Sequence, residues 1–200
     1  MKLVSILVFK WNSEKPILLS SHMDVSFANF FMRNAVKEHI VFHSRLICSR
    51  TGINMRQTIQ FEQNLGNCHS YVHPCGLACT VLTDAEYSQR VVYSLINQVL
   101  RSFHQIHHKA LDAITEDTEL PFPEGENFLQ SYQNPTEADK LLKVQKDLDE
   151  VRGVMLKNMD ELLQRGEKLD DLMMKTSDLS KTSLQFYRSA KKQNQCCRLY

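Results

Sequence analysis

The 200-residue sequence has no long apolar run, no excess of one charge and no leader-like opening. No stretch approaches the roughly 20 apolar residues that a membrane-spanning helix needs. The formal net charge of +1 gives no electrostatic reason to expect nucleic acid as a partner. The apolar residues 3–9 follow a single lysine and lack a small-residue cleavage site, so we expect a strand there and a cytoplasmic protein.

Signatures of catalysis and metal binding are also lacking. The sequence contains no G-x-S-x-G, P-loop or dinucleotide fingerprint. Histidines recur at short spacing, as His39 with His43, His69 with His73, and His104 with His107 and His108. No carboxylate or cysteine stands beside them at the spacing of a known metal motif, so we expect structural or solvated histidines, no cofactor and no enzyme. A metal-dependent enzyme is kept as an alternative that bound metal in the purified protein would reveal.

Six cysteines occur without a signal peptide, which favours reduced thiols over disulfides. Cys75 and Cys79 share one side of an alternating segment and are expected to be small core residues. Cys196 and Cys197, next to the C-terminus, form a different kind of pair.

The first 106 residues alternate between strand-like and helix-like patterns. We expect strands over 3–9, 17–21, 57–63, 68–72 and 77–82, and helices over 30–50 and 87–106. This order predicts an α+β fold around an antiparallel sheet of five strands. Residues 116–125 are acidic and contain two prolines, which is typical of a flexible connection.

The first helix carries two separate apolar bands. One band consists of Phe31, Ala35, Phe42 and Leu46, and the other of Val36, Ile40 and Ile47. A helix packed on a sheet needs only one such band, so the other is available to a second surface.

Residues 141–193 follow a heptad pattern over about seven repeats. Its apolar positions are Leu141, Val144, Leu148, Val151, Met155, Leu162, Leu169, Leu172, Leu179, Phe186 and Ala190, and its polar positions are Asn158, Arg165, Thr176, Ser183 and Gln193. A continuous helix of this length would be roughly 80 Å long and too narrowly apolar for a single-domain core, so it must pair with other helices. We call these positions the seam.

Arg165 interrupts the seam near its middle. Buried alone, its charge would cost several kcal/mol, so a partner bundle should supply polar groups at the same layer. An ordinary two-stranded coiled coil, from which Arg165 reaches solvent, is the alternative.

The segment Leu162–Leu172, with Arg165 at its centre, resembles the R-SNARE motif of the synaptobrevin family. The opening Met1–Leu3, the segment Asp84–Arg90 and the order of elements resemble the longin domain, a profilin-like fold with helices on both faces of its sheet. Residues 132–139 resemble the linker of the longin R-SNAREs that are palmitoylated and prenylated and have no transmembrane anchor.

The resemblance implies a longin domain over 1–115, a linker over 116–137, a SNARE coiled-coil helix over 138–195 and a lipidated tail over 196–200. It implies a parallel bundle with three Q-SNARE helices, in which the apolar seam forms the core and Arg165 is the zero-layer residue. Zippering of that bundle would fuse vesicle and target membranes, and SNAP and NSF-type machinery would take it apart. The protein would cycle between cytoplasm and the cytosolic face of Golgi, ER and vesicle membranes.

The tail is where this sequence departs from the family. Cys197 begins a four-residue prenylation frame and Cys196 is placed for palmitate. Arg198 is polar at an aliphatic position, and Tyr200 is outside the usual final residues. A prenylated Cys197 and an unmodified, reactive pair therefore both stay open, and with the second comes the alternative of a non-fusogenic soluble regulator.

A free SNARE motif has to hide its apolar seam. The spare band on the first helix could cover it, and the larger side chains of Phe31, Phe42 and Leu46 make that band our choice for an autoinhibitory contact.

Overall fold

The computed structural model describes residues 2–61, 66–134 and 153–196, with side chains described through Lys191. The described residues divide into two compact units, one within residues 2–24 and 44–162 and the other within residues 25–43 and 163–196. Helix α1 (Arg33–Ser49) contributes to both units.

The first unit is built on a sheet of six strands in the order β2-β1-β5-β4-β3-β6. The strands are β1 (Leu3–Lys10), β2 (Ile17–Met23), β3 (Arg56–Gln60), β4 (Asn67–Val72), β5 (Leu77–Thr83) and β6 (Met155–Asn158). Every pairing is antiparallel except that of β3 with β6. The expected α+β class is confirmed, and the sheet has one strand more than the five expected, because β6 joins its edge.

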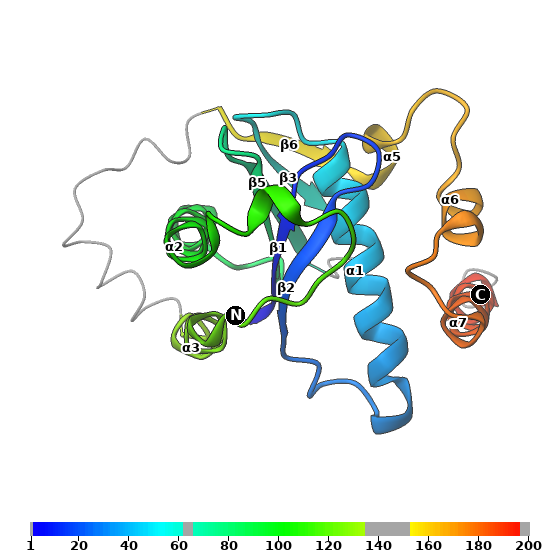
Figure 1. Ribbon diagram of the computed structural model, residues 1–200. Helices are drawn as coiled ribbons and strands as arrows, with labels where there is room; N and C mark the ends of the chain where they lie inside the picture. The colour runs from blue at the N-terminus through cyan, green and yellow to red at the C-terminus, as the bar shows by residue number, and fades with distance from the viewer. Residues whose placement is uncertain (1, 62–65, 135–152, 197–200) are drawn as a thin grey trace. The chain divides into compact units, whose positions relative to one another are not determined.

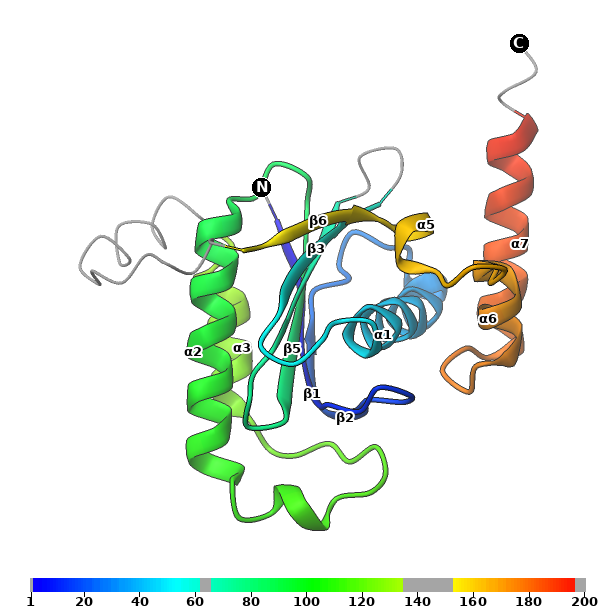
Figure 2. The same ribbon diagram turned by 90° about the horizontal axis from the view of Figure 1, so that it is seen from above.

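Helix α2 (Gln89–His107) and helix α3 (Pro123–Ser131) cover one face of the sheet, as Figure 2 shows. The apolar stripe of α2, including Val92, Leu95 and Val99, is completely buried. It packs against inward residues of β5 such as Cys79 and Val81, which alternate with residues of the other face. On that other face lies the C-terminal turn of α1, where Ile47 meets Ile59 and Cys68.

The acidic connection after α2 is held against the domain, in contrast to the flexible linker expected from its composition. After the short 3-10 helix η3 (Leu111–Ala113), the Thr118 N–H donates to Leu18 O at 3.0 Å and the Leu120 N–H donates to Leu19 O at 2.8 Å. Helix α3 then buries Leu129 against the core. Composition could not show this, because backbone pairing to the exposed edge strand β2 depends on position and not on residue type.

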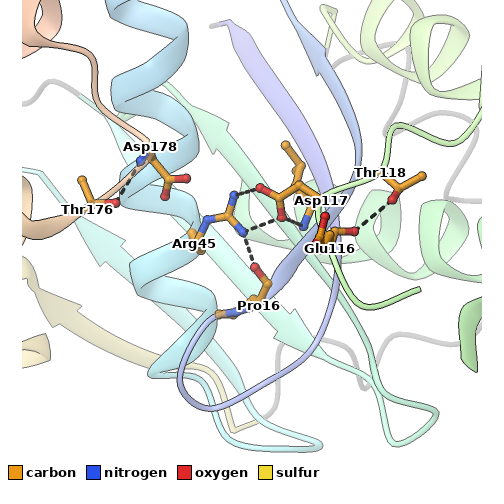
Figure 3. Close-up of polar contacts among 8 residues, drawn as sticks. Pro16, Arg45, Glu116, Asp117, Thr118, Thr176 and Asp178 are labelled. Carbon is orange, nitrogen blue, oxygen red and sulfur yellow. Dashed lines mark hydrogen bonds and ion pairs between the residues drawn. The ribbon is translucent and has the colours of Figure 1, made fainter. Parts of the chain in front are cut away.

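Arg45 anchors the same connection from α1 (Figure 3). Its guanidinium donates to both carboxylate oxygens of Asp117, at 3.0 and 2.7 Å, and to the carbonyl oxygen of Pro16. Partial burial raises the pKa of Asp117, but hydrogen bonds from Arg45 and from the Leu18 N–H outweigh it, so the pKa lies below its usual value. The planar guanidinium suits this forked contact in a way that lysine would not.

An Arg45→Met variant is expected to lower the free energy of unfolding by about 2 kcal/mol, because two charge-assisted hydrogen bonds are lost while Asp117 stays partly solvated. Urea unfolding followed by circular dichroism measures this. Arg101→Met, at an exposed arginine of α2, is the matched control and should change little. Equal midpoints for the Arg45 and Arg101 variants would show that the Arg45 ion pair contributes nothing.

The described part of the heptad region forms several short elements, where one long helix was expected. After β6 come α5 (Met159–Leu162), α6 (Leu169–Lys175) and α7 (Lys181–Cys196). Gly153 and Gly166 adopt left-handed φ values of 77° and 89°, which interrupt a helix at both places. A narrow heptad stripe buries too little area to hold a long helix without partner helices, so local packing decides instead.

Candidate functional site

Strand β6 places seam residues at the edge of the sheet. Met155 pairs with Gln57 and Asn158 with Gln60 in a parallel register along β3. The pairing satisfies backbone groups that β3 would otherwise expose at an edge. Met155 and Asn158, two predicted helix-bundle positions, are thus part of a β-sheet here.

Leu162 continues this use of the seam. Its side chain is 5% exposed and belongs to a core cluster with Ile47, Ile59 and Cys68. Burying a leucine stabilises a fold by roughly 1.5–3 kcal/mol. Leu162 is therefore a core residue of this fold, whereas the heptad pattern predicts that it is a core residue of a helix bundle.

Arg165 lies in an exposed turn just after this cluster, beside Gly166. Its charge is solvated here. The buried polar layer predicted around Arg165 belongs to a bundle with partner helices and stays a prediction.

The second unit brings helices α6 and α7 together with the N-terminal half of α1. Met173, Leu179 and Ser183 are buried, and the seam residues Leu169, Leu172, Phe186 and Ala190 are half-buried. Lys191 Nζ and Asp170 Oδ2 lie 2.6 Å apart, and the Tyr187 hydroxyl donates to Asp170 at 2.8 Å, so α6 is tied to α7.

Glu38 of α1 holds the beginning of α7. Its carboxylate accepts the Ser180 N–H at 2.7 Å and the Ser183 hydroxyl at 2.6 Å. Desolvation raises the pKa of Glu38, but the hydrogen bonds from Ser183 and Ser180 outweigh it and leave the pKa below its usual value. A carboxylate at the first turn of a helix also interacts favourably with the helix dipole. We call this arrangement the Glu38 contact.

His39 packs beside the Glu38 contact. Its Nε2 lies 3.1 Å from the carbonyl oxygen of Ser183, and its ring centroid lies 6.2 Å from Phe186 and 6.0 Å from Tyr187. Burial lowers the pKa of His39, although the Ser183 hydrogen bond and Glu38 oppose this. His43 behind it, whose Nδ1 is 2.8 Å from His39 O, has its pKa lowered to about 4 by burial.

Glu38 and His39 are neighbours in sequence, and each lies three or four residues from both Ala35 and Phe42, so the four residues share one face of α1. Phe42 is 5% exposed, whereas Phe31 is 88% exposed and Leu46 is half-buried beside the Leu162 cluster. In the other band Ile40 and Ile47 are both buried. The Phe42 band was predicted from side-chain size alone. Glu38 was not predicted, and its only indication in the sequence was that a polar residue, Ser183, occupies a seam position.

Two families match the chain, and together they extend over most of it. Residues 140–198 match the synaptobrevin family, and residues 20–137 match the longin family, a regulated-SNARE-like domain. The chain is 41% identical over 199 residues to the VAMP-like protein YKT61 of Arabidopsis thaliana, 40% to the putative synaptobrevin homolog YKT6 of Dictyostelium discoideum and 36% to the synaptobrevin homolog YKT6 of Saccharomyces cerevisiae. Each alignment covers 98% of both chains. The chain is a longin-domain R-SNARE of the synaptobrevin family.

Longin R-SNAREs are non-enzymatic proteins of membrane trafficking, so this R-SNARE is no enzyme. Across the described ranges no three of its histidine, cysteine, aspartate and glutamate side chains gather as a metal site. His69, one of the histidines considered above, is instead buried between Thr58 and Thr83, and burial lowers its pKa to about 3.

Several predicted positions of this R-SNARE lie outside the described residues. They are the seam residues Leu141, Val144, Leu148 and Val151, and the prenylation candidate Cys197. Cys196 is the last residue of α7, and its side chain is not among those described. Among the helices that are described, none combines the length and the apolar character needed to cross a membrane.

Proposed function

We propose that this R-SNARE drives fusion of vesicles with target membranes by zippering its motif into a four-helix bundle with three Q-SNARE helices. The motif stays folded on the longin domain until those partners compete for it. Residues 1–115 act as the regulatory domain, 116–137 as its connection, 138–195 as the fusion motif and 196–200 as the lipid-bearing tail.

The observation that carries this proposal is the double use of the seam. Leu162 and Leu179 are buried within the folded chain, at 5% and 7% exposure, yet the heptad pattern assigns both to a bundle core. One side chain cannot occupy both places. Folding of the motif and assembly of the bundle are therefore mutually exclusive, and the energy of the folded form is a barrier that partners must overcome.

Arg165 supplies the specificity in this proposal. In the bundle its guanidinium donates hydrogen bonds to one glutamine from each partner helix, which satisfies a charge that would otherwise be costly to bury. A single polar layer of this kind fixes the register of helices that could otherwise slip by a heptad. Because Arg165 lies in an exposed turn, its guanidinium is accessible to partner helices.

Lipids on Cys196 and Cys197 attach the tail to the cytosolic face of Golgi, ER and vesicle membranes in this proposal. Two chains give stable anchoring where one gives only marginal binding. SNAP and NSF-type machinery then recycles the R-SNARE.

The second candidate, a soluble regulator that does not fuse membranes, is favoured by Arg198 and Tyr200 in the prenylation frame. Incorporation of radiolabelled isoprenoid into the wild type but not into Cys197→Ser distinguishes the two candidates.

An Arg165→Leu variant is expected to assemble with Q-SNARE helices but to lose partner selectivity, because the apolar seam survives while the polar layer is gone. The measurement is a competition between matched and mismatched Q-SNARE sets, followed by the rise in helical circular dichroism. Arg188→Leu, at an exposed arginine of α7 outside the seam, is the matched control. Unchanged selectivity in the Arg165 variant, or no gain of helix in the wild type, contradicts the proposed bundle.

A further inference from the structure

The turn that leads into α1 presents an unusual concentration of exposed aromatic rings. Phe27 is 58% exposed, Phe30 74% and Phe31 88%, and Met32 beside them is 36% exposed. Three of these residues form the 3-10 helix η1 (Phe30–Met32). We call Phe27, Phe30, Phe31 and Met32 the aromatic turn. Phe31 belongs to the band predicted to make the autoinhibitory contact, but its 88% exposure leaves it uncovered here, and no role was assigned to the other three residues.

Hydrogen bonds fix the backbone conformation of the aromatic turn. The Ala28 N–H donates to Val25 O at 3.0 Å and the Met32 N–H donates to Asn29 O at 2.8 Å, while the Asn29 side chain accepts the Phe31 N–H. Val25, at 6% exposure, fixes the start of the turn. Hydrogen bonds at both ends thus hold the rings outward, so their exposure is a property of the fold.

The two most exposed rings pack on each other. Phe30 and Phe31 meet edge to face, with centroids 5.7 Å apart and planes at 84°. A ring that keeps 88% of its surface cannot be lining a groove, so the turn projects apolar surface from the protein. Exposed apolar patches of this kind mark contacts with proteins or membranes.

The charge around the aromatic turn decides between those partners. Between Val25 and Lys37 the charged residues are Arg33 and Lys37, and the acids Asp24 and Glu38 flank this segment. The Glu38 carboxylate accepts hydrogen bonds from Ser180 and Ser183. The Arg33 guanidinium lies 5.9 Å from the centre of the Phe30 ring, and its Nε donates to Ala28 O at 3.2 Å. Projecting phenyl rings beside fixed positive charge match an anionic lipid surface, where rings enter the interface and basic groups meet headgroups.

We propose that the aromatic turn is a membrane-contact site that inserts Phe30 and Phe31 into the interface of an anionic bilayer. This goes beyond the fusion role and requires no lipid on Cys197. Stable attachment takes two signals, and the prenylation frame of this chain departs from the usual pattern at Arg198 and Tyr200. A protein contact with the bilayer supplies a second signal that a single acyl chain would lack.

The test uses the full-length, unlipidated protein and two kinds of vesicle, phosphatidylcholine with phosphatidylserine and phosphatidylcholine alone. We expect binding to the anionic vesicles, and a loss of roughly tenfold or more in Phe30→Ser/Phe31→Ser, since two phenyl rings no longer leave water. Arg33→Glu/Lys37→Glu should weaken binding to the anionic vesicles and not to the neutral ones. Ile106→Ser, at a 50% exposed isoleucine of α2, is the matched control and should bind as the wild type does.

Insertion is read out separately with tryptophan. Phe31→Trp should show a blue-shifted emission and quenching by brominated lipid on anionic vesicles, while Ile106→Trp shows neither. Equal vesicle binding by the wild type and the Phe30/Phe31 variant, or an unquenched Phe31→Trp, overturns the proposal. If sedimentation instead shows that the wild type self-associates and the Phe30/Phe31 variant does not, the turn binds a second copy and the membrane assignment is wrong.

Discussion

A Phe42→Glu variant is expected to assemble with three Q-SNARE helices at least roughly tenfold faster than the wild type and to have a larger hydrodynamic radius. Phe42 is 5% exposed on the α1 face that also carries Glu38 and His39. Keeping a carboxylate buried there without a partner costs several kcal/mol, and a factor of ten in an equilibrium constant corresponds to about 1.4 kcal/mol. In the Phe42→Glu variant the SNARE motif should therefore dissociate from this face of α1.

The longin domain itself should survive this change. Ile47, one turn and a half further along α1, stays within the core cluster, and Arg45 still holds Asp117. Phe31→Glu is the matched control, because it introduces the same charge on an 88% exposed ring of the same band. Stopped-flow assembly and analytical ultracentrifugation in solution provide the measurement. A compact Phe42→Glu protein with the assembly rate of the wild type contradicts the proposed autoregulation.

The longin half of the fold was largely predictable, because its signals are periodic. Residues 3–9 form a short apolar run, which is typical of a buried strand, and β1 extends over Leu3–Lys10. The α2 stripe from Val91 to Phe103 recurs at helical spacing, and all of its apolar members are buried. In such elements burial against the core determines the residue types of a short stretch, so that stretch is enough to predict the helix or strand.

The structure of the SNARE motif could not be predicted in the same way, because its sequence suits two environments. Met155–Asn158 follows the heptad pattern, yet it pairs with β3 through backbone hydrogen bonds, which leave no trace in residue type. Leu162 suits a helical seam and a mixed core equally well. The heptad pattern predicts contacts with partner helices, which stay a prediction, while the structure shows where Met155, Asn158 and Leu162 lie in the chain by itself.

A Glu38→Lys variant is expected to release the start of α7, so that backbone amides of Ser183 to Tyr187 exchange hydrogen on the order of a hundredfold faster. Glu38 accepts two hydrogen bonds, and bonds to a charged group are worth about 1.5–3 kcal/mol each. A lysine can accept neither, and it places a cation beside two donors and the N-terminus of a helix. Glu38→Gln keeps an acceptor and should lie between the two proteins.

Acid should weaken the same contact in the wild type, and the three groups His39, Glu38 and His43 act in one direction. Burial lowers the pKa of His39 below 6.5, so the folded contact disfavours a proton that the released form accepts, and stability is lost as pH falls below 6.5. The pKa of Glu38 is lowered from 4.5, so its contribution is present above that value and disappears as pH falls through the lowered pKa. His43 and Tyr187 also face His39, and His43, with a pKa lowered to about 4, adds to the loss in the same sense.

Hydrogen exchange of α7 from pH 7.5 down to pH 5, corrected for intrinsic rates, measures the histidine contribution by itself, because Glu38 stays ionised over this range. The wild type should lose protection across this range, and His39→Phe should lose less, because the ring that packs on Phe186 remains while the titrating group is gone. Glu14→Lys, an exposed reversal of the same charge, should behave as the wild type does throughout. If Glu38→Lys exchanges α7 amides no faster than Glu14→Lys, the hydrogen bonds from Ser180 and Ser183 do not hold α7, and Phe42 and its neighbours must do so alone.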